Sequence, residues 1–153
     1  MAKIIYLISV GKLSNQNISM VFNEYIKRIS PFFKIIQKEI KEFGLKESEE
    51  INKESEKLLE LISIDTFVIV CDQNGVSLSS KMFFEKLDNI IQKSKSITII
   101  IGGAFGLSNQ VKEKADLLLS LSPMTFTHQT ARLIVIEQIY RYCMFKAKHP
   151  FVK

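Results

Sequence analysis

The residues best suited to do chemistry lie in the second half of the chain, beginning with a glycine-rich segment. An apolar run over residues 99–101 stops at Gly102 and Gly103, and Gly106 follows three positions later. Glycine has no side chain to hold another molecule at a distance, so its backbone can approach a ligand closely. The pattern predicts a loop whose backbone meets a ligand. A tight turn into the next helix is the other interpretation of the same glycines.

His128 and Arg132 form a second candidate. They are four positions apart, which places both side chains on one face of a helix. A histidine can take up or release a proton near neutral pH, and an arginine can bind a phosphate or an oxyanion with two N–H groups. Helix capping and a structural ion pair are the alternative role. The spacing alone does not decide between the two.

Other motifs argue against several classes of site. The chain has no GxxxxGK[ST] segment, and its Gly-Gly-x-x-Gly run is not the GxGxxG fingerprint of dinucleotide-binding folds. Cys71 and Cys143 are far apart and lie in no CxxC or Cys/His spacing. The sequence therefore indicates neither a P-loop, nor a zinc site, nor a disulfide framework, and both thiols are expected to be reduced.

Length and composition fit one soluble domain over residues 1–153, which we expect in the cytoplasm. The first apolar run ends at Gly11 and Lys12 without the pattern of a signal peptide, and no run approaches the length of a membrane helix. The net charge is +5, and charges balance over residues 1–65, so the excess lies after them. Its densest part is near the C-terminus and suits a phosphate backbone or a solvated helix end. The basic residues there are Arg132, Arg141, Lys146, Lys148 and Lys153.

Apolar runs that alternate with segments of helical spacing predict the elements that position these residues. They indicate an α/β domain with a mainly parallel sheet covered on both faces. Asp72 to Gly75 is predicted to be the turn that ends the third strand. Because ligands bind beyond the carboxyl ends of parallel strands, the ends of strands three, four and five are expected to form one pocket. The predicted strands are 3–10, 32–40, 66–71, 96–101 and 117–121, and the predicted helices are 17–29, 46–62, 80–92, 108–114 and 128–147.

The last predicted helix is apolar around nearly its whole circumference. Ile134, Ile136, Tyr140 and Phe145 fall on different sides of it. One sheet cannot cover all of these side chains. The pattern predicts a homodimer in which a second copy covers the outer side of this helix.

Several blocks in order along the chain carry a family resemblance. They are Ser9-Val10-Gly11-Lys12, Glu24-Tyr25-x-Lys27-Arg28, Leu78-Ser79-Ser80, Ile101-Gly102-Gly103-x-x-Gly106-Leu107, Ser120-Leu121-Ser122-x-Met124-Thr125-Phe126-x-His128-Gln129-x-x-Arg132 and Glu137-Gln138-x-Tyr140-Arg141. Together they resemble the bacterial large-subunit ribosomal RNA pseudouridine N3-methyltransferases, essentially from end to end. The resemblance implies the α/β-knot fold of the SPOUT methyltransferases and a homodimer.

The resemblance also implies a reaction and a site. The reaction would transfer the methyl group of S-adenosylmethionine to N3 of a pseudouridine in 23S rRNA, within the large subunit or the ribosome, without a metal. His128 and Arg132 match the family pattern and would orient the target. The residues that match the cofactor site are Cys71 (where the family usually has leucine), Gly102, Gly103, Leu121, Ser122, Pro123, Met124, Thr125 and Phe126.

The C-terminus departs from the family pattern. Members usually end in His-Pro-Tyr-His and a basic residue, whereas this chain ends in His149-Pro150-Phe151-Val152-Lys153. Val152 cannot handle a proton as histidine can. Two alternatives therefore stand beside the implied reaction: an RNA- or ribosome-binding SPOUT protein with lost or altered activity, and a related methyltransferase acting on another RNA.

Overall fold

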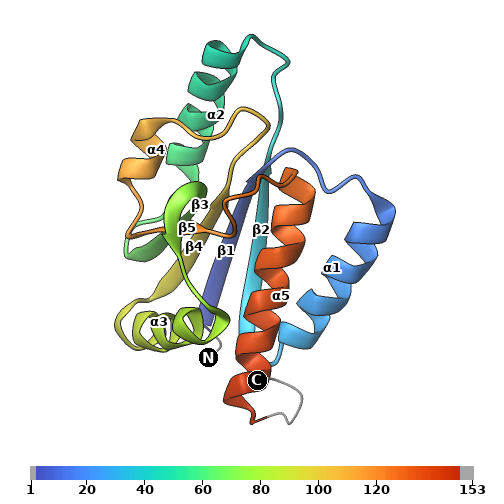
Figure 1. Cartoon of the computed structure of the whole chain (residues 1–153), viewed down its shortest axis with the longest axis vertical. Helices are drawn as coiled ribbons and strands as arrows, with labels where there is room; N and C mark the ends of the chain where they lie inside the picture. The colour runs from blue at the N-terminus through green and yellow to red at the C-terminus, as the bar shows by residue number, and fades with distance from the viewer. Residues whose placement is uncertain (1–2, 149–153) are drawn as a thin grey trace.

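The chain folds into a five-stranded parallel sheet flanked by helices (Figure 1). The computed structural model describes residues 3–148. The strand order is β2-β1-β4-β3-β5, and each neighbouring pair is parallel. The predicted α/β class is therefore confirmed. The elements are β1 (Lys3–Val10), α1 (Gln16–Ile29), β2 (Phe33–Ile40), α2 (Glu47–Leu61), β3 (Thr66–Ser77), α3 (Ser80–Lys93), β4 (Ser96–Ile101), α4 (Asn109–Glu113), β5 (Leu117–Ser120) and α5 (His128–Lys146).

Both faces of the sheet are covered, as the apolar strands predict. One hydrophobic cluster joins the strands to α1, α3 and α5 and includes Phe22, Phe84 and Ile136. The other lies under α2 and α4, where Leu58 and Val111 are fully buried. A parallel strand between two helical layers has no solvent face, which is why the strand residues are apolar on both sides.

β3 differs from the prediction, because the expected turn at 72–75 is wrong. The strand continues to Ser77, and both Cys71 and Val76 pair with Leu119 of β5, so residues 72–75 form a bulge. Gly75 passes so close to β5 that a Cβ atom there would lie 2.5 Å from the carbonyl oxygen of Leu118. Asp-Gln-Asn-Gly favours a turn locally, but pairing with β5 resumes after it. The bulge lies at the carboxyl end of the sheet.

Side-chain caps mark the start of every described helix except α2. Ser79 caps α3, and Ser108 caps the short α4. The Thr127 hydroxyl accepts a hydrogen bond from the N–H of Thr130, so α5 begins at His128, as predicted. A capped start defines the direction of the first turn. His128 is thereby held at the N-terminal end of α5.

The outer side of α5 is partly covered within the same chain. α1 packs beside α5, where the rings of Tyr25 and Tyr140 are 5.1 Å apart and the Arg28 guanidinium lies 5.8 Å from the Tyr140 ring. Phe145 remains 42% exposed. The homodimer, the knot and the single-domain boundary remain predictions. Within residues 3–148, no helix has the length and apolar character required to span a membrane.

Candidate functional site

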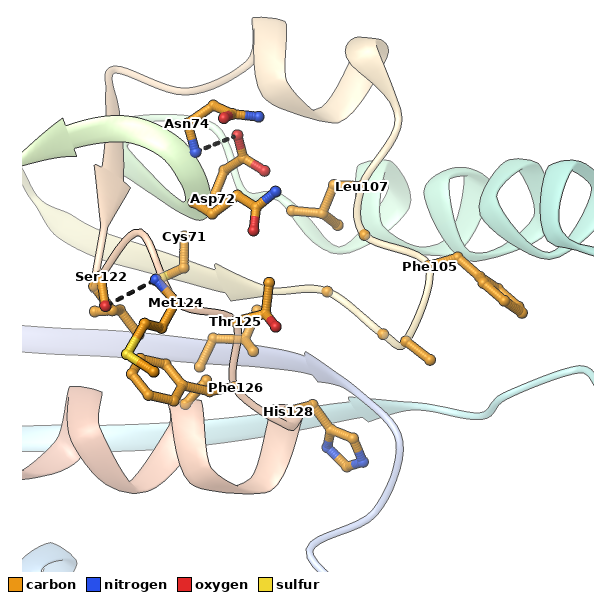
Figure 2. A pocket seen from close by; sticks show the side chains of 18 of the residues that line it. Cys71, Asp72, Asn74, Phe105, Leu107, Ser122, Met124, Thr125, Phe126 and His128 are labelled. Atoms are coloured by element: carbon orange, nitrogen blue, oxygen red, sulfur yellow. Dashed lines mark hydrogen bonds between the residues drawn. The ribbon is translucent and has the colours of Figure 1, made fainter.

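The carboxyl ends of β3, β4 and β5 meet at a cavity of about 370 Å³ (Figure 2). Its size lies within the range of small-molecule sites. Of the residues proposed from the sequence, those lining it are Cys71, Gly102, Gly103, Leu121, Ser122, Met124, Thr125, Phe126 and His128. Pro123 and Arg132 are not part of the lining. The structure thus brings together the segments that the sequence places at three strand ends.

The glycine loop after β4 owes its shape to its glycines. A Cβ atom at Gly102 would lie 2.7 Å from Cγ of Leu107, and Gly106 has a φ of +82°, where a side chain would be strained. The Gly106 N–H donates to the carbonyl of Gly103 at 3.1 Å, which closes the loop. The tight-turn interpretation of these glycines therefore holds, and the same turn leaves the loop as one wall of the cavity.

The loop between β5 and α5 forms the opposite wall. The N–H of Met124 donates to the hydroxyl of Ser122 at 3.0 Å, which folds the loop back on itself. Met124 and Phe126 are 75% and 41% exposed and stand together at the rim in Figure 2. This wall carries the apolar side chains of Leu121, Met124 and Phe126 and the uncharged hydroxyl groups of Ser122 and Thr125, a surface suited to a flat, weakly charged ligand.

A third wall is polar. The sequence places the end of the third strand at this pocket but does not single out Gln73, Asn74 or Lys112 as part of its lining. The bulge of β3 places Asp72, Gln73 and Asn74 in the lining, and Lys112 reaches it from α4. The Lys112 ammonium lies 3.5 Å from the Asp72 carboxylate, which also accepts the N–H of Asn74. Lys112 is the one lysine or arginine among the described residues that line the cavity. Because Asp72 balances it, the lining has little excess positive charge with which to attract a phosphate.

His128 stands at the edge of the cavity, with its side chain 17% exposed. Its Nε2 is 3.9 Å from a carboxylate oxygen of Glu42, and the ring packs on Gly11, where a Cβ atom would lie 2.8 Å from it. Burial lowers the pKa of His128, Arg132 lowers it further, and the carboxylates of Glu42 and Glu39 oppose that shift. The imidazole is therefore mainly neutral at pH 7 and can accept a proton.

Arg132 does not line the cavity and is 1% exposed. Its Nη1 donates to the Glu39 carboxylate at 2.7 Å and to the carbonyl of Gly11 at 3.4 Å, and its Nη2 donates to the Gln37 side chain at 3.3 Å. These bonds tie α5 to β2 and to the segment after β1. The geometry favours a structural role for Arg132, and direct contact with a substrate remains untested.

Known proteins place this arrangement in a family. A parallel α/β sheet with a cavity at the carboxyl ends of its strands is typical of small-molecule-binding proteins of the open-sheet type. The family model described as predicted SPOUT methyltransferase matches residues 4–151. The chain therefore belongs to the SPOUT methyltransferases, as the motifs of the sequence indicate.

Relatives match along almost the whole chain. It is 45% identical over 143 residues to the ribosomal RNA large subunit methyltransferase H of Caldicellulosiruptor bescii, covering 90% of this chain and 92% of that protein. It is 39% identical to the protein of the same name from Dictyoglomus thermophilum, covering 96% and 97%. Among solved structures, the SpoU methyltransferase AviRb from Streptomyces viridochromogenes, in complex with AdoMet, aligns with a TM-score of 0.48 and 9% identity over 94% of this chain and 61% of that one. A structural similarity with this TM-score does not add to the family assignment.

Proposed function

We propose that this chain is an S-adenosylmethionine-dependent methyltransferase that acts in the cytoplasm on N3 of a pseudouridine in 23S rRNA. The observation that carries the proposal is its 45% identity, over nine tenths of its length, to a protein named as a large-subunit rRNA methyltransferase. The resemblance of its motifs to the pseudouridine N3-methyltransferases supplies the position on the base. The proposed assembly is a homodimer that binds the large subunit or the ribosome.

The cavity fits S-adenosylmethionine better than a phosphorylated cofactor. One wall offers the backbone of Gly102 and Gly103, and another offers the backbone and apolar rim of residues 121–126. The polar wall balances Lys112 with Asp72, as suits a nucleoside that carries no phosphate. When bound there, the cofactor supplies a methyl group on a positively charged sulfur.

The chemistry left to the protein is positioning and removal of one proton. N3 of pseudouridine carries a weakly acidic imide proton that must leave as the methyl group arrives, so a nearby base accelerates the reaction. His128 stands at the cavity edge with a lowered pKa and can accept that proton or orient the base. Arg132 would act through α5, by fixing the first turn that carries His128.

Mass spectrometry of 23S rRNA nucleosides tests the proposal. RNA from a deletion strain should lack one N3-methylpseudouridine that the wild-type strain contains, and the wild-type gene should restore it. No difference at any pseudouridine would favour the RNA-binding alternative, which was motivated by Phe151 and Val152, residues outside those that the structure describes. A methyl group missing from another nucleotide would show a related enzyme with a different target.

A further inference from the structure

Glu54 is a buried acid that the proposed mechanism leaves unused. It lies on α2, is 3% exposed, and its Oε1 has no hydrogen-bond partner among residues 3–148. Buried polar side-chain atoms are nearly always hydrogen-bonded, because desolvation without a partner is costly. A carboxyl group in this state is an exception to that rule.

The carboxyl group lies directly behind the glycine loop. A Cβ atom on Gly103 would lie 3.0 Å from Oε1 and 3.2 Å from Oε2 of Glu54, so a side chain at position 103 would require the carboxyl group to shift. Gly103 lines the cavity, whereas Glu54 does not. The backbone of Gly103 therefore lies between the carboxyl group and the proposed ligand.

The charged groups that face Glu54 are acidic. Glu50, one turn earlier on α2, accepts the N–H groups of Phe43 and Leu45 at 3.0 Å each, and Glu42 adds a second negative charge. Desolvation, together with Glu50 and Glu42, raises the pKa of Glu54 to about 7.

Among the described residues, the charged groups that shift the pKa of Glu54 include no cation. Val10 of β1 and Gly103 carry no charge, and Lys112 of α4, the helix that packs against α2, is paired with Asp72. A positive charge in the cavity would therefore favour the ionised form of Glu54, since unlike charges attract strongly where solvent is excluded.

We propose that Glu54 is a positioning residue that makes the cavity selective for a positively charged ligand. Its carboxylate attracts the positively charged sulfonium of S-adenosylmethionine across the backbone of Gly103. The neutral thioether that remains after methyl transfer does not gain from this attraction. This inference rests on the proposed function. Its consequence is that the product is held less tightly than the cofactor and exchanges readily for it.

Calorimetric titration with S-adenosylmethionine and with S-adenosylhomocysteine tests the charge selectivity. Glu54→Gln keeps the size and shape of the side chain but cannot ionise. It should weaken binding of S-adenosylmethionine about tenfold and that of S-adenosylhomocysteine less than twofold. Glu60→Gln, an exposed position on the same helix, is the matched control and should change neither. If Glu54 had only a structural role, the substitution would weaken the binding of both ligands equally. The ratio of the two dissociation constants is therefore the deciding readout.

Proton release by the wild-type protein provides a test that needs no variant to fold. Titrations near pH 7 in two buffers of different ionisation enthalpy should show that S-adenosylmethionine expels protons and S-adenosylhomocysteine does not. His128→Gln should retain this release and Glu54→Gln should abolish it. Equal weakening of both ligands, an unchanged ratio, or no proton release would overturn the inference. A wild-type protein that binds neither ligand would overturn the proposed function itself.

Discussion

Arg132 shows how burial changes the role expected of a residue. The family resemblance implies that Arg132 and His128 both orient the target, but Arg132 is 1% exposed and bonded to Glu39, Gly11 and Gln37. Arg132→Ala should lower the free energy of unfolding by about 3 kcal/mol, because it removes the packing and the hydrogen bonds of a buried side chain. The partly exposed Glu39 keeps the N–H of Leu13 as a donor. Arg132→Lys should lose less of the free energy of unfolding than Arg132→Ala but stay below the wild type, since lysine cannot form the paired contacts of a guanidinium group.

Denaturant unfolding of both variants measures this effect. Arg28→Ala is the control, because its pair with Glu24 is exposed on α1 and should contribute less than about 1 kcal/mol. If Arg132→Ala is as stable as the wild type but has impaired turnover, the result would support direct contact between Arg132 and the substrate.

Substitution of His128, unlike that of Arg132, should affect activity more than stability. Burial holds the pKa of His128 below its ordinary value, so the neutral imidazole is the form present at pH 7. If His128 accepts the proton, activity should fall as the pH drops through that lowered pKa. The stability that comes from burying a neutral ring should also fall as the pH drops. The acidic limb of the pH–rate profile should therefore lie below about 6.5.

NMR titration of the histidine ring gives the pKa directly, with His128→Gln used to assign the signal. The same variant should lose the acidic limb while its melting temperature stays close to that of the wild type. A limb that persists in His128→Gln would assign the base elsewhere.

At the scale of elements, the sequence determines most boundaries through local signals. Asn15, Ser108 and Thr127 cap their helices, and the starts of β1 and β4 match their predicted positions. The bulge of β3 could not be predicted this way, because the strand resumes only through pairing with β5, which lies distant in sequence. Gln73 and Asn74 were missed as part of the cavity lining for the same reason.

The close passage of Gly75 beside β5 yields a prediction about the bulge. Gly75→Ala would place a Cβ atom 2.5 Å from the Leu118 carbonyl oxygen, so the strands must separate. The variant should be destabilised by about 1 to 3 kcal/mol and should bind S-adenosylmethionine less tightly, because Asp72 moves with the bulge. Thermal melts and calorimetry measure the two effects. Val76→Ala, at a neighbouring position that is 53% exposed, should have little effect on either, and a similar loss in both variants would contradict the role of the close approach.

At the scale of the whole molecule, the open question is what covers α5. Its apolar circumference predicts a second copy, yet α1 already packs on Tyr140, so Tyr140→Asp would disturb the subunit itself. Phe145 is the better position, because it is 42% exposed near the C-terminal end of α5, although it also contacts Phe84.

Phe145→Asp should convert a dimer into a monomer of 17.6 kDa in sedimentation experiments, since a buried charge without a partner opposes association. Ile64→Asp is the control, because Ile64 is 91% exposed and follows α2, which packs in a different core cluster from α5. The melting temperature of each variant separates loss of association from loss of folding. A Phe145→Asp protein that stays dimeric would place the interface on another surface of the molecule, and a wild-type monomer would mean that α1 and the sheet alone satisfy the apolar faces of α5.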